Sequence, residues 1–272
     1  MSKFVIDHDL HLHSQLSLCS GDPAQTAEAL LAYGVRQGLA DICVTDHYWD
    51  ENVPGASGWY AAQNFAHISP ILPLPQNREC RFHFGCEIDM DQFCTVGISE
   101  KMLDAFAFII VPTSHLHMTG FTIAPEDTSP ARRAELYLQR NHALLDMDLP
   151  FHKFGVAHLA SGLIWHFDYE TEKTYLKILD SITDEEMARL FTKAAKKQLG
   201  VELNQDDMHV GITHEKGESV LRVFRIAKEC GCKFYCGSDA HSPSWFDNFL
   251  PVMEKAVEKL GLTEDDKIAF CK

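Results

Sequence analysis

The chain has 272 residues, of which 46% are hydrophobic and 23% are charged, so it is long enough to bury one large core. Its formal net charge of -15 argues against a nonspecific nucleic-acid surface, because phosphate backbones are bound by clustered lysines and arginines. No apolar run approaches the length of a membrane span, no apolar leader follows Met1, and the nine cysteines are scattered. We therefore expect a cytoplasmic protein with reduced thiols.

Short apolar runs of strand length recur along the chain. Their β-branched and aromatic content favours strands, although periodicity alone does not separate such runs from buried helix segments. In chain order they cover residues 4–13, 41–45, 81–88, 106–113, 153–158, 200–203 and 233–237.

Helix signals lie between several of these runs. A polar N-cap, a proline in the first turn or a glycine after the last turn marks a helix end. Three helices are predicted on such signals: one from Asp22-Pro23 to Gly38, one opened by Pro130, and one from the capping box Thr183/Glu186 to Gly200. Two more are expected over residues 218–230 and 245–260.

The alternation of strands and helices predicts a parallel α/β sheet, and roughly seven strands indicate a barrel or near-barrel. In such folds the functional loops leave the C-terminal ends of the strands. Residues 48–77 and 118–130 are expected to be long loops, the first of them over the site. No repeat or linker divides the chain, so we expect residues 1–272 to form a single domain.

Histidines and carboxylates follow most of the predicted strands. Residues two apart in a strand point to the same side, so His11 and His13 project together, as do Asp239 and His241. One such pair can be accidental, but the recurrence indicates a multinuclear metal site at one end of the sheet, and hence metal-assisted hydrolysis. The segments are Asp9-Leu10-His11-Leu12-His13, Thr45-Asp46-His47, Cys86-Glu87-Ile88-Asp89, Ser114-His115-Leu116-His117, Ala157-His158 and Ser238-Asp239-Ala240-His241.

Several of these residues suggest more specific roles. Asp9 shares a face with His11 and suits a supporting role, orienting an imidazole through its second nitrogen. Glu87 would be an expensive buried charge unless paired or metal-bound, and a carboxylate can bridge two cations. For His115 a hydrogen-bonded core histidine is a real alternative, and His117 could touch a substrate.

The motifs resemble those of the polymerase and histidinol phosphatase (PHP) family of metal-dependent phosphoesterases. The matching segments follow the family's order over almost the whole chain: Asp9-Leu-His-Leu-His13-Ser14, Val44-Thr-Asp-His47, Gly85-Cys-Glu87, Ser114-His115, Ala157-His158, Glu202-Leu-Asn204 and Gly237-Ser-Asp-Ala-His241. The resemblance implies a distorted (β/α)7 TIM-like barrel that binds two or three divalent ions, zinc, manganese or iron, at the C-terminal ends of its strands. The metal ligands that it implies are His11, His13, His47, Glu87, His115, His158, Asp239 and His241. Glu87, His115 and Asp239 are the candidate catalytic residues among them.

One stretch departs from the family pattern. Members often carry a further histidine or aspartate shortly after the paired histidines, where this chain reads Ser17-Leu18-Cys19-Ser20-Gly21-Asp22. Cys19 could replace that residue as a soft ligand and Asp22 as a hard one, although Asp22 is also predicted to cap a helix. Two cations are therefore expected, and a third stays open.

The predicted reaction is hydrolysis of a small phosphomonoester by a metal-activated water, with histidinol phosphate as the first substrate to test. Arg132 or Arg133 is the nearest candidate for a further positive charge beside the phosphate, against the alternative of a solvated helix face. Trp49, Trp59 and Tyr60 could pack against a substrate ring, against the alternative of packing within their loop.

Three alternatives stay open. A nucleotide or oligonucleotide phosphatase of the same family would share the site. An amidohydrolase barrel also begins with paired histidines, but it usually ends on a lone aspartate rather than on Asp239-x-His241. A metal-binding module without catalysis is the third, and a nearly complete set of ligands argues against it, because buried charges without a partner are costly.

Overall fold

The structure is a computed structural model that describes residues 2–166 and 173–270. Its strands pair in parallel in two sheets, one ordered β1-β2-β4 and the other β3-β5-β6-β7-β8-β9. The strands are β1 (His8–Leu12), β2 (Asp41–Val44), β3 (His47–Tyr48), β4 (Arg81–Phe84), β5 (Cys86–Ile88), β6 (Ile109–Val111), β7 (Phe154–Val156), β8 (Gly200–Asn204) and β9 (Lys233–Gly237).

Two long strands are each broken into two shorter ones, and the breaks separate the strands into two sheets. β2 ends at Val44 and β3 begins at His47, and the two pair with β4 and β5 respectively. β4 and β5 together correspond to the predicted strand 81–88, which breaks at Gly85. A side chain at Gly85 would place its Cβ 2.5 Å from the carbonyl oxygen of Phe108, so only glycine allows this close approach to the next strand.

The first and last strands lie side by side, which completes the barrel. The amide of Asp239, just after β9, donates to the carbonyl of His11 at 2.8 Å, and the amide of His13 donates to the carbonyl of Ala240 at 3.2 Å. The strands of the two sheets thus follow one another around a distorted barrel. The predicted fold class, an α/β barrel of parallel strands, is confirmed.

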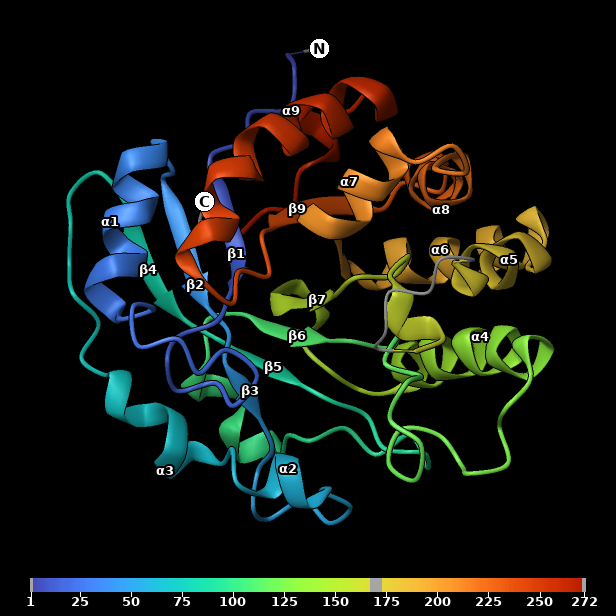
Figure 1. Ribbon diagram of the computed structural model, residues 1–272, viewed down its shortest axis with the longest axis horizontal. Helices are drawn as coiled ribbons and strands as arrows, with labels where there is room; N and C mark the ends of the chain where they lie inside the picture. Colours follow the sequence, from blue (N-terminus) through green and yellow to red (C-terminus); the bar gives the residue numbers. More distant parts are fainter. Residues whose placement is uncertain (1, 167–172, 271–272) are drawn as a thin grey trace.

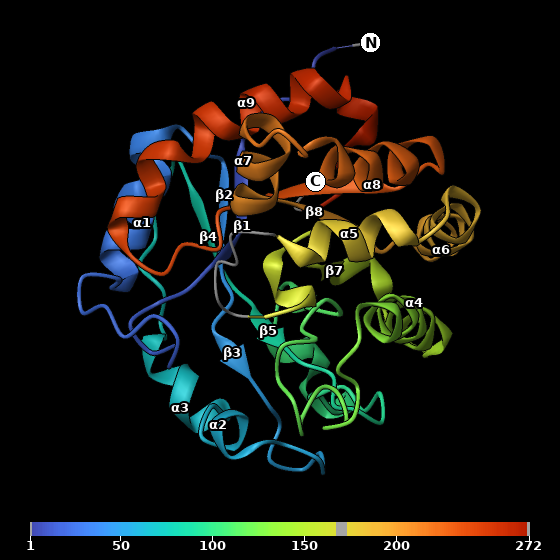
Figure 2. The same cartoon turned by 45° about the vertical axis from the view of Figure 1, so that its right-hand side comes forward.

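Helices surround the strands (Figure 1), and the turned view shows the strands in the middle of the ring that the helices form (Figure 2). Apolar residues on one side of each long helix are buried toward the strands, as Val223 and Phe224 of α8 illustrate. The helices are α1 (Ala27–Gln37), α2 (Gly58–Ala61), α3 (Phe65–Ile68), α4 (Pro130–Asp146), α5 (Thr174–Ser181), α6 (Asp184–Lys197), α7 (Gln205–Thr213), α8 (Glu218–Glu229) and α9 (Phe249–Leu260).

The start of α1 differs from the prediction. The helix begins at Ala27, because the hydroxyl of Thr26 caps it by accepting from the amide of Ala29 at 3.2 Å. Asp22 accepts from the amide of Ala24 at 2.9 Å in the turn before the helix. The prediction that Asp22 caps this helix was therefore wrong.

Other element boundaries also differ from the predicted ones. The capping box of Thr183 and Glu186 at the start of α6 is confirmed, but α6 ends on Gln198 in the left-handed conformation, and Gly200 opens β8 instead. β1 begins only at His8, and the predicted loop 48–77 contains the short helices α2 and α3. Helices α5 and α7 were not predicted: α5 has no side-chain cap, whereas the side chain of Asn204 caps α7, a signal that the sequence analysis did not use.

A small buried cluster fills the barrel interior beneath the C-terminal strand ends. Residues near the C-terminus, Ile268 and Phe270, pack against it. The cluster consists of Leu10, Cys43, Phe108, Ile110, Ala157 and Tyr235. None of the helices within the described residues combines the length and the hydrophobicity that a membrane span requires.

Candidate metal centre

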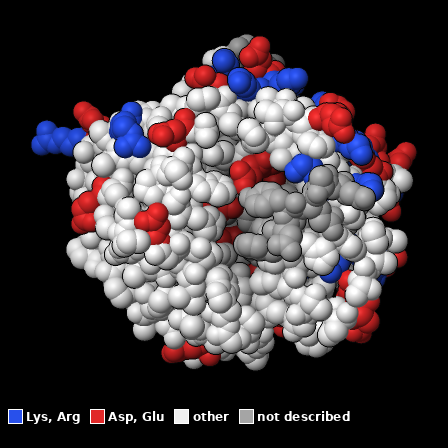
Figure 3. Space-filling view, in the orientation of Figure 1, with Lys and Arg blue, Asp and Glu red and all other residues white. Residues whose placement is uncertain are grey.

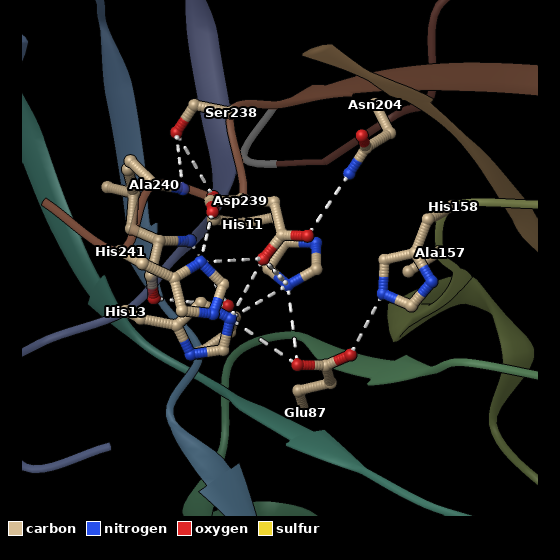
Figure 4. Close-up of polar contacts among 12 residues, drawn as sticks. His11, His13, Glu87, Ala157, His158, Asn204, Ser238, Asp239, Ala240 and His241 are labelled. Atoms are coloured by element: carbon tan, nitrogen blue, oxygen red, sulfur yellow. Dashed lines mark hydrogen bonds and ion pairs between the residues drawn. The ribbon is translucent and has the colours of Figure 1, made fainter. Parts of the chain in front are cut away.

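The structure gathers the predicted metal ligands at the C-terminal ends of the strands. Figure 4 shows six of them: His11, His13, Glu87, His158, Asp239 and His241. Among the described residues, overlapping groups of three each place their ligand atoms within 4.8 Å of one another. The groups are His11, His158 and Asp239; His11, His13 and Glu87; His13, Asp239 and His241; Glu87, His115 and His158; and His13, Cys19 and His47.

His11, His13, Glu87 and Asp239 form the most regular arrangement. Nε2 of His13 lies 3.2 Å from Nε2 of His11, 3.1 Å from Oδ1 of Asp239 and 3.4 Å from Oε2 of Glu87. Nε2 of His11 lies 3.3 Å from the same Asp239 oxygen and 3.5 Å from the same Glu87 oxygen. Four ligand atoms placed tetrahedrally at zinc-binding distance lie roughly 3.4 Å apart. The donor atoms therefore fit a small divalent cation in kind and in spacing.

Glu87 reaches a second group with its other oxygen. Oε1 of Glu87 lies 3.2 Å from Nε2 of His158, and the His158 ring stacks on that of His115 with centroids 4.8 Å apart. These three residues form one of the candidate ligand groups. One oxygen of Glu87 in each group gives this carboxylate the geometry to bridge two cations.

The charge states of these groups suit cation binding. Burial opposes ionisation of Glu87, but His47 and His11 hold the pKa of its carboxyl well below the usual value. Burial likewise opposes ionisation of Asp239, but the charge on His11, the hydrogen bond with His13 and the charge on His241 together lower this pKa. Burial lowers the pKa of His13 to about 3 and that of His47 to about 4. Ionised carboxylates and neutral imidazoles are the forms that ligate metals.

His11 and His158 differ from the other imidazoles. Burial would lower their pKa values, but nearby carboxylates raise them, Asp239 foremost for His11 and Glu87 foremost for His158, whose pKa reaches about 9. In the metal-free protein, protons on these two rings compensate the carboxylates. Metal uptake should therefore release protons.

The residue that orients His11 is not the one that the sequence suggested. Nδ1 of His11 bonds Oε1 of Glu202 in β8 at 2.7 Å. Asp9 instead accepts from the amide of Ser238 and from the Tyr33 hydroxyl, both at 2.9 Å, and so fastens β1 to the end of β9. The predicted role of Asp9 was wrong. Glu202 could have been found as a lone charge inside an apolar strand, which is the argument that identified Glu87.

Asp89 orients His115 in the same manner. Its Oδ2 lies 2.8 Å from Nδ1 of His115 and accepts from the Tyr60 hydroxyl at 2.9 Å, while Oδ1 lies 3.6 Å from the buried guanidinium of Arg140. Asp89 stands two residues after Glu87, so strand alternation already placed both carboxylates on one side. The sequence analysis quoted Asp89 without giving it a role.

We expect Asp89→Asn to weaken metal binding in the group of Glu87, His115 and His158 by roughly 10- to 100-fold, because His115 loses the carboxylate that orients its ring. Zinc titration against a competing chelator measures this. Asp91→Asn is the matched control, since Asp91 accepts from the amides of Phe93 and Thr95 outside the cluster. Equal zinc affinity in Asp89→Asn and wild type would contradict the assignment.

A cavity of about 760 Å³ lies over the cluster, and His47, Glu87, His115, His158 and Asp239 line it. Acidic atoms are visible in the hollow in the middle of the face that Figure 3 shows. Aromatic side chains form part of the wall, among them Trp59, Trp165, Tyr175 and Trp245. The cavity is therefore acidic and metal-ligating at its base and aromatic along its sides.

The aromatic residues singled out in the sequence have different surroundings. Trp59 lines the cavity, is 38% exposed and meets the His47 ring edge-on at 5.0 Å. Tyr60 also borders the cavity but is fully buried, bonded to Asp89. Trp49 is buried in a separate apolar cluster. Only Trp59 combines exposure with a position at the cavity.

Of the three predicted substrate-binding residues, one lies at the cavity and two do not. His117 lines the cavity. Arg132 is paired with Asp127 and Glu135, each at 2.8 Å, and does not line it. Arg133 is buried with its guanidinium carbon 5.6 Å from the Trp165 ring, and it also lies outside the lining.

Asp207, in α7, is a buried acid in the cavity wall. One of its oxygens accepts from the amide of Ala160 at 2.9 Å, and the other has no hydrogen-bond partner among the described residues. Burial raises the pKa of this carboxyl to about 8. The folded protein therefore keeps a proton that the unfolded chain loses near the ordinary aspartate pKa of 3.8.

This retained proton makes the free energy of unfolding fall as the pH rises from about 4 to about 8, because the folded state binds more protons in that range. Asp207→Asn cannot ionise and should lose this dependence. We expect the stability of the variant relative to wild type to increase by more than about 1 kcal/mol across that range. Urea unfolding at both ends of the range measures it, and parallel pH profiles would contradict it.

Neither a family model nor a curated protein matches the sequence. Among solved structures, the histidinol phosphate phosphatase of Lactococcus lactis subsp. lactis, complexed with zinc, L-histidinol and phosphate, is similar with a TM-score of 0.60 and 18% identity. The match covers 97% of this chain and 98% of that chain. A candidate histidinol phosphatase of Listeria monocytogenes has a TM-score of 0.58 and 14% identity, over 88% of this chain and 96% of that chain.

At such identities the likeness concerns the fold. It extends over nearly the whole of this chain and of the two proteins compared. The chain thus has the fold of these two proteins, the fold that the resemblance implied.

Proposed function

We propose that the protein is a metal-dependent phosphomonoesterase, with histidinol phosphate as the first substrate to test. The observation that carries this proposal is the close approach of ligand atoms of Glu87 and Asp239 to those of His11 and His13, at 3.1–3.5 Å, with Glu87 shared with the next group. When bound, two or three zinc, manganese or iron ions would bind the phosphate oxygens and lower the pKa of a water toward neutrality.

Different residues would hold the two cations. His11, His13, Glu87 and Asp239 would hold one cation, and Glu87, His115 and His158 the second. The Glu87 side chain is only 1% exposed, whereas that of Asp239 is 20% exposed and lines the cavity. Asp239 would therefore be the carboxylate that faces an incoming water, and Glu87 would be shared by the two groups of ligands.

The cavity favours a small substrate over a nucleic acid. Of the described residues in its lining, Lys173 is the only lysine or arginine, while Asp206 joins the carboxylates Glu87 and Asp239 there. An acidic wall repels a chain of phosphates and suits an organic group that carries an amine. Aromatic side chains such as Trp59 suit a ring. The Lactococcus enzyme was solved with L-histidinol and phosphate, which have this chemistry.

A phosphate-release panel on the metal-loaded protein tests the proposal. The panel compares histidinol phosphate with nucleoside monophosphates and a short oligonucleotide. We expect release from histidinol phosphate with a higher kcat/KM than from the nucleotides. Preferred release from nucleotides would favour the alternative of a nucleotide phosphatase. No release from any phosphomonoester, with metal content confirmed, would refute the proposal.

Trp59→Ala should raise KM roughly 2- to 10-fold with little change in kcat, because one aromatic contact contributes about 0.5–1.5 kcal/mol to binding a ring. Steady-state kinetics on histidinol phosphate measure this effect. Phe93→Ala is a control, since Phe93 is 80% exposed and does not line the cavity. An unchanged KM in Trp59→Ala would remove Trp59 from substrate binding.

A further inference from the structure

Arg140 is a charged side chain on the apolar face of α4. Leu136 and Leu144, one turn before it and one turn after it, are buried on the same side of the helix, and Arg140 itself is only 1% exposed. A buried guanidinium is costly unless its N–H groups find acceptors. The hydrogen bonds of Arg140 therefore have to compensate its burial.

The acceptors are backbone carbonyls of three separate segments. Just after β5, the Met90 carbonyl accepts from Nη2 at 2.8 Å and the Asp91 carbonyl from Nη1 at 2.9 Å. Just after β6, the Thr113 carbonyl accepts from Nε at 3.2 Å, and in the loop that follows, the Thr122 carbonyl accepts from Nη1 at 2.8 Å. Lysine cannot reproduce this pattern, because its donors all lie on one nitrogen, whereas a guanidinium presents five in a planar fork. One side chain thus fastens three segments to one another.

These segments carry the contact that orients His115. Oδ2 of Asp89 lies 2.8 Å from Nδ1 of His115. Oδ1 of Asp89 accepts from the amide of Met90 at 2.6 Å and lies 3.6 Å from Nη2 of Arg140. Thr113 stands two residues before His115 in the sequence. The guanidinium therefore holds the chain on both sides of the contact between Asp89 and His115.

Arg140 also supports Asp89 through an aromatic contact. Phe121 is next in sequence to Thr122, and its ring centroid lies 5.2 Å from that of Tyr60. The Tyr60 hydroxyl donates to Oδ2 of Asp89 at 2.9 Å, the same oxygen that faces the histidine. Loss of the guanidinium would release the Thr122 carbonyl, and with it the loop that packs against Tyr60.

We propose that Arg140 is a positioning residue for the cation that Glu87, His115 and His158 would hold. Arg140 does not line the cavity, so it acts through Asp89, by fixing the segments after β5 and β6 where Asp89 orients the His115 ring. This inference rests on the metal centre of the proposed function. An arginine that served only the stability of the fold would leave the affinity for this cation unchanged.

A double-mutant cycle on zinc affinity tests the proposal without relying on turnover. Arg140→Lys, Asp89→Asn and the double variant of the full-length protein are titrated with zinc against a competing chelator. The step that is followed is the one that Asp89→Asn weakens. We expect Arg140→Lys to weaken it about tenfold, as for other residues that support a metal ligand. Added to Asp89→Asn, it should weaken binding by no more than about a further twofold, because both changes act on one contact.

Arg222→Lys is the matched control. Arg222, in α8, also donates to two backbone carbonyls, that of Leu179 at 3.2 Å and that of Ile182 at 2.6 Å, but it lies outside the cavity lining. It should keep the zinc affinity of wild type, and thermal unfolding shows how much stability each variant loses. Equal losses of zinc affinity in the two lysine variants would overturn the inference, as would wild-type affinity in Arg140→Lys or a full tenfold further loss in the double variant.

Amide hydrogen exchange of the wild-type protein decides the case in which Arg140→Lys does not fold. Coupling between two places in a protein is reciprocal, so zinc that orders His115 should also order the segments that Arg140 fastens. We expect zinc to slow exchange around Thr122 more than around Ile182, in the loop that Arg222 fastens. Equal slowing at both places would overturn the inference.

Zinc affinity and phosphate release separate this inference from the proposed function. Coupled losses of affinity in Arg140→Lys and Asp89→Asn support the inference, even where the protein hydrolyses no phosphomonoester and the proposed function fails. Hydrolysis by wild type, together with unchanged zinc affinity in Arg140→Lys, overturns the inference and leaves the function standing. A wild-type protein that binds no zinc also overturns it.

Discussion

Asp239→Asn should reduce kcat/KM for a phosphomonoester by a factor on the order of a thousand, because a ligand carboxylate supplies several kcal/mol of charge stabilisation through the metal. Its Oδ1 lies 3.1 Å from His13 and 3.3 Å from His11, so the amide would present a neutral group at the centre of the ligand set. Asp239 has a φ of 54°, a conformation that asparagine tolerates as well as aspartate. The substitution therefore removes the charge while keeping the backbone. Steady-state kinetics, metal analysis and thermal unfolding of the one variant are the measurements.

The comparison of activity with stability separates a catalytic centre from a structural one. A catalytic site predicts a large loss of turnover with a small change in melting temperature, and His11→Ala should behave likewise. A purely structural cluster predicts a sharp fall in melting temperature, since metal binding then contributes directly to folding. Wild-type turnover and metal content in Asp239→Asn would show that this residue is not part of the site.

Asp41→Asn is the matched control. Asp41 is a buried carboxylate at the start of β2, paired with Arg81 at 2.6 Å and with His83 at 2.7 Å. It thus lies at the end of the strand opposite to the metal ligands. We expect its replacement to lower stability and to leave kcat/KM unchanged.

Exhaustive chelation should abolish phosphate release, and zinc or manganese should restore it. In the described part of the cavity wall, Lys173 is the only lysine or arginine, so the protein has little else with which to bind a phosphate. Loss of the cation also leaves the buried carboxylate of Glu87 to be compensated by protons on His11 and His158. We therefore expect only a small fall in melting temperature beside the large loss of activity, and both should recover when metal is returned.

Phosphate release is followed before chelation, after removal of the chelator and after addition of each metal, with bound metal measured at every stage. Chelator that has been saturated with zinc beforehand is the control for direct inhibition. Turnover that continues in protein shown to hold no metal would refute a metal-dependent mechanism.

The kind and the order of the candidate ligands could be predicted from the sequence because they depend on local properties. His11 and His13 are two residues apart at the end of β1, and a strand places such residues on one side whatever its neighbours are. The apolar runs before Glu87 and His158 likewise favoured strands, because of their aromatic and β-branched residues. The parallel α/β fold followed from the spacing of these runs.

Which residues orient the metal ligands is decided by contacts between strands that are far apart in the sequence. Asp9 and Glu202 both lay on strands near His11, but the pairing of β1 with β2 is irregular between Asp9 and Leu12, and Glu202 is the one placed against Nδ1 of His11. Such a shift in register arises from packing between segments, so no local pattern reports it.

Loop paths likewise required the tertiary structure. Cys19 was a soft candidate ligand in the sequence and Asp22 a hard one that was also predicted to cap a helix. The turn before α1 places Cys19 beside His13, and Asp22 accepts from the amide of Ala24. The sequence by itself thus determined the fold class and the kinds of side chain available to the site. The tertiary structure decided which of them meet, because strand register and loop course are set by the packing of the whole barrel rather than by neighbouring residues.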